Sequence, residues 1–210
     1  MLEVSSFSKE YNGHTILNVP QLSVPAGVSW FQGVNGSGKS TFFKAISGII
    51  PFDGEVSFTD GLSLKKSPVD FRRRINYSFA EPRYPEFVSG KEILEYHLKT
   101  YRGSRRDLDR LLELFGVTAY YHTKIATYSS GMLKKISLIA AFIGSPEILA
   151  LDEPFTTIDI KTQEILLSVL SECHHKGQSI LVASHHDWSH DLLKIDHHFK
   201  VENQTIHVAS

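Results

Sequence analysis

The feature that most constrains the fold of this chain is a glycine-rich segment at residues 33–40. It reads Gly-Val-Asn-Gly-Ser-Gly-Lys-Ser and satisfies GxxxxGK[ST] at every fixed position. Glycines let the backbone curl so that consecutive N–H groups point inward, and a helix that begins there directs its positive dipole end at the same place. The residues before the segment, Val28–Gln32, predict a strand, and residues 41–46 predict a helix. This order is that of a phosphate-binding loop in an α/β fold.

Each residue type in this loop has an expected role toward a nucleotide. Lys39 is expected to reach the β- and γ-phosphates, and the Ser40 hydroxyl is expected to ligate Mg²⁺. The full set of expected nucleotide-binding residues is Gly33, Asn35, Gly36, Ser37, Gly38, Lys39, Ser40 and Thr41. A chance match would arise on the order of once in a hundred chains of this length. By itself the loop indicates nucleotide binding and nothing narrower.

Apolar runs and turn residues divide the rest of the chain into alternating strands and helices. Strands are predicted at 2–7, 15–19, 54–58, 77–79, 148–151 and 179–183, helices at 132–142 and 161–174, and a hairpin at 198–208. Apolar residues recur at helical spacing between 86 and 127. We therefore predict a single α/β domain over residues 1–210, with a P-loop NTPase core and a mostly parallel sheet. An antiparallel β subdomain is expected on its N-terminal side, and an inserted helical subdomain at about 82–127 between core segments 1–81 and 128–210.

Composition restricts the cellular compartment and the classes of binding partner that we expect for this chain. The formal net charge of −1 gives no electrostatic reason to expect nucleic acid. Cys173 is the one cysteine, so it has no internal disulfide partner, which favours a reducing cytoplasm. The first ten residues lack the pattern of a signal peptide, and no stretch approaches the roughly 20 apolar residues of a membrane-spanning helix. Any membrane role is therefore expected to come through a partner.

A pair of carboxylates follows the apolar strand predicted at 148–151. A buried parallel strand would deliver Asp152 to the carboxyl edge of the sheet, where open α/β sheets bind ligands. There Asp152 is expected to hold Mg²⁺, and Glu153 is placed to polarise an attacking water as a general base. A carboxylate pair at a strand end is more often a turn or a helix cap. Because a complete phosphate-binding loop lies upstream, we favour the functional interpretation of this pair over the structural one.

The segment 128–132, Tyr-Ser-Ser-Gly-Met, begins a predicted helix, with Ser129 or Ser130 as its N-cap. The order of motifs here resembles the nucleotide-binding domains of ABC transporters over essentially the whole chain. In that family a signature at this helix start binds the γ-phosphate of ATP held by the other subunit. The resemblance assigns this contact to Ser129 and Gly131, with Met132 in the place of the signature glutamine.

The same resemblance gives roles to three further residues. Tyr11 is similar to the aromatic residue that stacks on adenine, although a strand tyrosine packed at the edge of the core is as good a reading of the residue type. Asp159 resembles the aspartate of a loop that crosses the dimer interface. His185 resembles the switch histidine that contacts the γ-phosphate. The chain has eleven histidines, but many form adjacent pairs, which lack the spacing of a metal site.

The chain departs from the family pattern after the strand predicted at 77–79. Family members have a glutamine there that senses Mg²⁺ and couples to the membrane subunits. Ala80 occupies that place, and Glu81 would substitute only after a shift of one residue. Ser130 replaces a signature glycine, and Lys135 stands where arginine is common. None of these changes removes a residue expected to carry out hydrolysis.

The resemblance implies an ATP-hydrolysing subunit that uses ATP and Mg²⁺. It would work as a homodimer, or as a heterodimer with another ABC ATPase subunit, docked on transmembrane permease subunits at the inner face of the cell membrane. A soluble ABC-type ATPase that acts as an assembly or regulatory factor is the alternative. A generic phosphate-loop kinase or GTPase is disfavoured by the signature-like motif and by the histidine after the last core strand.

Overall fold

The computed structural model describes residues 1–187 and 193–209. Its strands are β1 (Leu2–Tyr11), β2 (His14–Val24), β3 (Val28–Gln32), β4 (Asp53–Phe58), β5 (Ile75–Ser78), β6 (Ile148–Asp152), β7 (Ser179–Ser184), β8 (His197–Glu202) and β9 (Thr205–Val208). Its helices are α1 (Lys39–Ile46), α2 (Pro68–Arg74), α3 (Gly90–Thr100), α4 (Arg105–Leu114), α5 (Ser130–Phe142) and α6 (Ile160–His175), with a short 3₁₀ turn at Ile125–Thr127.

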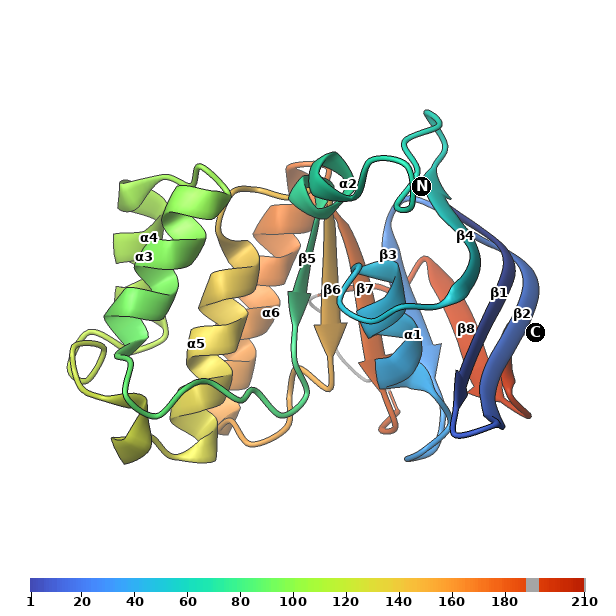
Figure 1. The fold of residues 1–210 in the computed structure, drawn as a ribbon. Coiled ribbons are helices and arrows are strands. Elements are labelled where there is room, and N and C mark those ends of the chain that lie inside the picture. Colours follow the sequence, from blue (N-terminus) through green and yellow to red (C-terminus); the bar gives the residue numbers. More distant parts are fainter. Residues whose placement is uncertain (188–192, 210) are drawn as a thin grey trace.

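The strands form two sheets (Figure 1). Strands β2, β1 and β4 make an antiparallel sheet in that order. The second sheet has the order β5-β6-β7-β3-β8-β9, and its pairs are parallel except for the terminal β8–β9 hairpin. The predicted α/β fold, with a mostly parallel sheet and an antiparallel sheet from the N-terminal strands, is therefore confirmed.

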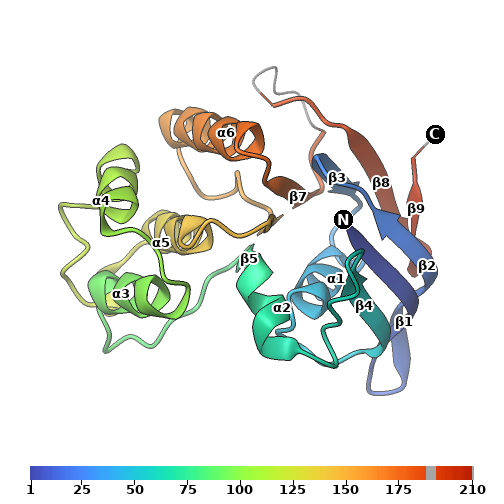
Figure 2. The same ribbon diagram turned by 90° about the horizontal axis from the view of Figure 1, so that it is seen from above.

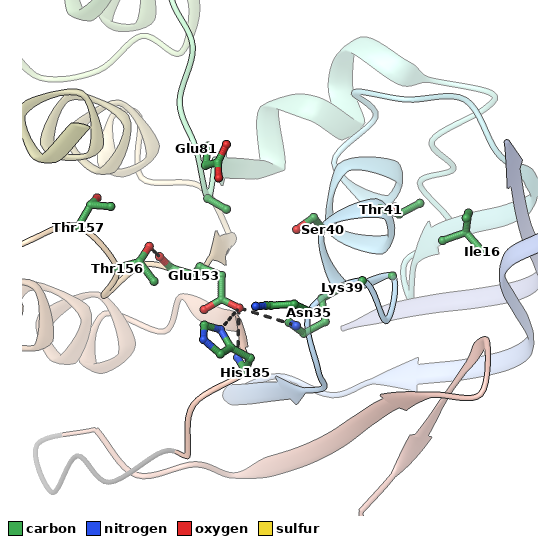
Figure 3. A pocket seen from close by; sticks show the side chains of 13 residues that line it. Ile16, Asn35, Lys39, Ser40, Thr41, Glu81, Glu153, Thr156, Thr157 and His185 are labelled. Carbon is green, nitrogen blue, oxygen red and sulfur yellow. Dashed lines mark hydrogen bonds and ion pairs between the residues drawn. The ribbon is translucent and has the colours of Figure 1, made fainter. Parts of the chain in front are cut away.

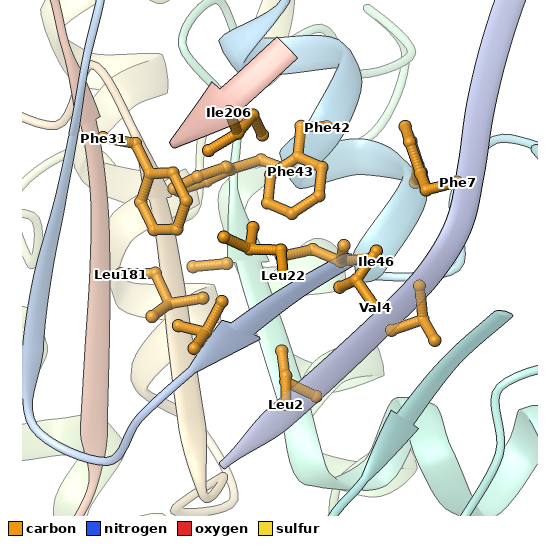
Figure 4. Packing of buried hydrophobic residues seen from close by; sticks show 14 of the residues in the cluster. Leu2, Val4, Phe7, Leu22, Phe31, Phe42, Phe43, Ile46, Leu181 and Ile206 are labelled. Carbon is orange, nitrogen blue, oxygen red and sulfur yellow. The ribbon is translucent and has the colours of Figure 1, made fainter. Parts of the chain in front are cut away.

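Alternating side chains on the parallel strands divide the interior into two hydrophobic clusters. Ala150 and Leu181 face helix α1 and the antiparallel sheet, whereas Leu149 and Ile180 face α5 and α6. Helix α1 consequently lies between the two sheets, and α5 and α6 cover the opposite face (Figures 1 and 2). Figure 4 shows the aromatic centre of the first cluster, where the ring of Phe31 packs edge-on against that of Phe43. This burial fixes the start of α1 against the sheet.

Helices α3 and α4 are inserted in the chain between β5 and α5 (Figure 2). Ser89 caps α3 in a capping box with Glu92, and Ser104 caps α4. Their apolar faces bury Leu94, Leu108 and Leu112 with residues of α5 in the second cluster. In the described part of the chain, none of the helices combines the length and apolar composition that crossing a bilayer requires.

Helix α2 is absent from the sequence-based prediction. Its seven residues bury a single side chain, Phe71, so no hydrophobic period marks it. The available signals were Pro68 in the first turn, where its missing N–H is not needed, and the basic residues of the last turn, which suit the negative end of the helix dipole. The next strand also differs from the prediction: β5 covers Ile75–Ser78 and ends before Phe79. Its pairing with β6 stops at Ser78, because the chain then leaves the sheet.

Candidate nucleotide-binding site

Three neighbouring parallel strands bring the predicted site residues to one edge of the sheet. Gln32 at the end of β3 pairs with Ser184 at the end of β7, and Asp152 at the end of β6 pairs with Ala183. Beyond this edge lies a cavity of about 530 Å³ (Figure 3). It is lined by Ile16, Asn35, Gly36, Gly38, Lys39, Ser40, Thr41, Ala80, Glu81, Glu153, Thr156, Thr157 and His185.

The glycine-rich loop leads from β3 directly into α1. Gly38 precedes the helix with a φ of 104°, in the region that favours glycine, and a Cβ there would lie 2.8 Å from Leu17. A Cβ on Gly33 would lie 2.5 Å from the carbonyl oxygen of Val201. These two glycines allow the sharp loop and its close packing. The N-terminus of α1, with its free N–H groups, therefore faces the cavity.

Lys39 lies at the first position of α1 and its side chain folds back over the loop. Its ammonium donates to the carbonyl oxygens of Gly33 at 2.7 Å and Val34 at 3.0 Å. The same ammonium lies 3.8 Å from the Glu153 carboxylate (Figure 3). Burial lowers the pKa of Lys39, an effect opposed by the Glu153 and Asp152 carboxylates. The cation is thus held between the loop and the acidic pair.

Glu153 is fixed by an unusual backbone conformation and by His185. Its φ of 44° is uncommon for a residue with a side chain, and its N–H donates to the carbonyl oxygen of Ala183 at 2.9 Å. The backbone N–H of His185 donates to Glu153 Oε1 at 3.1 Å, and His185 Nδ1 lies 2.9 Å from the same oxygen. Strained backbone of this kind is common where a side chain must be aimed at a ligand.

Asp152 is buried beneath the cavity at 0% exposure. The Tyr77 hydroxyl donates to its Oδ2 at 2.9 Å, and Ser40 also hydrogen-bonds to the carboxylate. Burial raises the pKa of Asp152, while the bonds from Ser40 and Tyr77 lower it. Among the described residues nothing hydrogen-bonds to Oδ1. An unpartnered carboxylate oxygen beside a serine hydroxyl is the oxygen donor set that Mg²⁺ takes, so the residues present fit the predicted ion.

Within the described residues there is no group of three or more His, Cys, Asp or Glu side chains arranged to hold a metal ion. This absence does not bear on Ser40 and Asp152, because Mg²⁺ in nucleotide sites is held by one or two protein oxygens together with phosphates.

Seven predicted residues are not among the described residues that line the cavity: Gly33 and Ser37 of the loop, the buried Asp152, Tyr11, and the group Ser129, Gly131 and Asp159. Ser129 is the N-cap of α5 and accepts from the N–H of Met132 at 3.3 Å. Asp159 is the N-cap of α6, and Lys135 lies 3.8 Å from its carboxylate. A Cβ on Gly131 would lie 2.7 Å from the carbonyl oxygen of Thr157. The start of α5 therefore packs closely against the loop that precedes α6. It does not line the cavity beside the glycine-rich loop.

Tyr11 lies at the end of β1, opposite His14 across the β1–β2 turn. It is 46% exposed, and the Lys9 ammonium lies 4.7 Å above its ring. From this part of the molecule it is Ile16 that lines the cavity. The contact of Tyr11 with adenine stays a prediction.

Sequence reasoning missed two residues that contact the acidic pair. Tyr77 is a strand residue of ordinary appearance, and nothing in the sequence sets it apart. Lys134 is completely buried and donates to the carbonyl oxygen of Asp152 at 2.9 Å. Its signal was present, because Lys134 lies on the same helical face as Leu138 and Ala141, which are buried. A charge on an apolar face calls for an explanation.

A family model described as ABC transporter matches residues 17–156 of the chain. The linearmycin resistance ATP-binding protein LnrL of Bacillus subtilis (strain 168) is 28% identical over 191 residues, which cover 89% of this chain and 61% of that protein. The uncharacterized ABC transporter ATP-binding protein YhaQ of the same organism is 30% identical over 196 residues, covering 88% and 63%. The chain thus spans less than two thirds of the length of these curated relatives.

Solved structures agree with this likeness. One described as the ATP binding subunit of an ABC transporter superimposes with a TM-score of 0.87 at 27% identity, covering 100% of this chain and 90% of that one. A dimeric ATP-binding cassette, MJ0796, in a post-hydrolysis state bound to ADP and Pi, gives a TM-score of 0.81 at 20% identity over 98% of this chain and 96% of that one. The second likeness is one of fold.

Proposed function

Because this chain belongs to the ABC transporter family and has the fold of its ATPase domains, we propose that it binds and hydrolyses ATP to power a transporter. In this proposal two ATP-binding chains close around ATP and dock on separate transmembrane subunits. The observation that carries the proposal is one cavity edge where the glycine-rich loop, Glu153 and His185 meet. That arrangement supplies phosphate binding and a base at the same point.

The loop and the helix dipole bind the phosphates of ATP. Asn35, Gly36 and Gly38 of the loop and the N-terminus of α1 line the cavity, and Lys39 exchanges its loop carbonyls for phosphate oxygens. Ser40 and Asp152 would hold Mg²⁺, and the ion would neutralise part of the phosphate charge. The Lys39 ammonium supplies further positive charge as negative charge develops on the transferred phosphoryl group.

Glu153 acts on the attacking water. Its carboxylate takes the water proton as the new phosphorus–oxygen bond forms and the bond to ADP breaks. His185 contacts Glu153 Oε1 through both a ring nitrogen and the backbone, so it orients this carboxylate and contacts the γ-phosphate from the same edge. The constrained backbone of Glu153 keeps its side chain pointed into the cavity (Figure 3).

A second chain completes the site. Ser129 and Gly131 lie at the start of α5, outside the cavity of their own chain, which leaves them available to ATP held by a partner. The Asp159 carboxylate lies 3.8 Å from the ammonium of Lys135, which is in α5, so Asp159 contributes to the same surface. ATP favours the closed pair because the γ-phosphate then receives contacts from both chains, and hydrolysis removes that advantage.

The helical insertion at 82–127 is proposed to receive the transmembrane subunits. It exposes three large apolar side chains, Phe87 at 76%, Tyr96 at 66% and Leu114 at 38%. These suit contact with an apolar segment of a membrane partner. The chain would then lie on the cytoplasmic side, at the inner face of the membrane.

The test is to isolate the ATP-bound complex. Tagged Glu153→Gln chain is expressed in its native cell, membranes are solubilised gently with ATP and Mg²⁺, and co-purifying proteins are identified. Lys39→Ala chain, which should not retain ATP, is the matched control. We expect multi-spanning membrane proteins that are enriched with Glu153→Gln over Lys39→Ala. Cytosolic partners alone would replace the transporter proposal with the assembly-factor alternative.

A further inference from the structure

Lys134 is a buried cation that the roles proposed above do not use. It lies in the second turn of α5, the helix that begins at the Ser129 cap and packs against β5 (Figure 1). Its residue exposure is 0%. Removing an ammonium from water is costly unless its donors are satisfied, and an apolar residue of similar length would fill the same volume without that cost.

The three donors of the ammonium go to three peptide carbonyls. Lys134 Nζ lies 2.7 Å from Phe79 O, 3.3 Å from Ala80 O and 2.9 Å from Asp152 O. The last pair of the β5–β6 ladder is Ser78 with Leu151. All three acceptors therefore lie just past the point where β5 and β6 separate. Lys134 connects the backbones of the two segments where they are no longer joined by strand pairing.

A second residue of α5 contacts the same segment. Ser137, one turn after Lys134, lies 3.1 Å from the Ser78 hydroxyl and accepts from the N–H of Phe79 at 3.2 Å. The segment that leaves β5 is thus attached to one face of α5 at successive residues. Ala80 and Glu81, which follow directly, line the nucleotide cavity.

We propose that Lys134 is a positioning residue for ATP hydrolysis, whose ammonium holds the Asp152 peptide, and with it both acidic side chains, against the segment Phe79–Ala80. Three parts of the site meet at this one group: the helix that begins at Ser129, the segment where the family has a glutamine, and the acidic pair. Ala80 has no side chain that could reach the nucleotide, so a displacement of α5 reaches Asp152 and Glu153 through Lys134. The inference rests on the roles proposed for those two carboxylates.

The test compares the full chain with Lys134→Met and Lys134→Gln. Methionine keeps the length and loses all donors, whereas glutamine keeps donors for some of the three carbonyls. Lys99→Met, on the exposed face of α3, is the control for loss of a lysine. We expect kcat for ATP hydrolysis to fall roughly 10- to 100-fold in Lys134→Met and by less in Lys134→Gln, as for other residues that orient metal-binding groups. KM for ATP should change by less than about threefold, because the glycine-rich loop is untouched.

A merely structural role would give a different pattern. The thermal midpoint is measured for every variant, and Lys134→Gln decides by the same criteria should Lys134→Met fail to fold. A kcat within about twofold of the wild type, or equal losses in kcat and in ATP affinity, would overturn the inference. Glu153→Gln is assayed alongside: rapid hydrolysis by that variant defeats the proposed base, whereas a normal Lys134→Met beside an inactive Glu153→Gln defeats only the role of Lys134.

Discussion

The two surfaces proposed to contact ATP differ in how completely one chain builds them. The loop surface is assembled from distant segments, with Lys39 of α1, Glu153 after β6 and His185 after β7 joined by contacts shorter than 4 Å. The signature surface at Ser129, Gly131 and Asp159 has its contacts among neighbours of α5 and α6 and lines no part of that cavity. The first surface therefore joins side chains from three separate segments of the chain, and the second is the one that the proposed function assigns to a partner chain.

Replacing the base is expected to break the chemistry of the loop surface most severely. Glu153→Gln should lower kcat by about 10²- to 10⁴-fold, because the amide cannot accept the water proton. ATP binding should persist, since the loop and Lys39 remain. Single-turnover hydrolysis together with equilibrium ATP binding measures both quantities. Glu153→Asp, which keeps a carboxylate on a shorter stem, is the matched variant, and fast turnover by Glu153→Gln contradicts the assignment.

Removing the lysine tests binding by the same surface. Lys39→Ala should weaken ATP binding by about 3 kcal/mol, or roughly 100-fold in Kd, through loss of charge-assisted hydrogen bonds to phosphate. Isothermal titration of the full chain with ATP and Mg²⁺ gives the value. Lys44→Ala, in the last turn of the same helix, controls for loss of a cation from α1. An unchanged affinity would mean that Lys39 stays on its loop carbonyls.

Mixing two defective chains separates the surfaces directly. Ser129→Arg should prevent ATP-dependent dimerisation while leaving ATP binding by one chain within about twofold, because Ser129 lies outside the cavity. Neither Ser129→Arg nor Lys39→Ala should hydrolyse ATP alone. Their mixture should regain activity, since a pair of the two chains contains one intact composite site. If the mixture stays inactive although each chain is folded, the shared site is disproved.

A smaller effect on Mg²⁺ activation is expected from replacing Tyr77, which donates a hydrogen bond to Asp152, the proposed Mg²⁺ ligand. Tyr77→Phe removes the hydroxyl that donates to Asp152 Oδ2 and should cost about 1 kcal/mol, or roughly fivefold in the Mg²⁺ concentration that half-activates hydrolysis. Tyr84→Phe, in the segment after β5, is a matched loss of a hydroxyl. A response equal to that of Tyr84→Phe would show that the bond does not tune the ion site.

The loop and the acidic pair were predictable because each is contiguous in the sequence. Residues 33–40 carry their own backbone geometry, and the apolar run before Asp152 predicts a buried strand that ends at the same sheet edge. Tyr77 and Lys134 were not identified, because each acts on Asp152 from a segment distant in the sequence. Helix α2 was missed because Phe71 is its only buried residue, so its sequence shows no helical repeat of apolar residues.

The sequence by itself determined the fold class, the glycine-rich turn between β3 and α1 and the position of the acidic pair at the end of β6, since local spacing and side-chain alternation are properties of the chain. Only the tertiary structure decided which side chains satisfy one another. The contact of His185 with Glu153 and the attachment of Lys134 to the carbonyls of Phe79, Ala80 and Asp152 depend on strand order and on how α5 packs. Hydrogen-bond partners lie within a few ångströms in space but at any separation along the chain, so spacing alone does not reveal them.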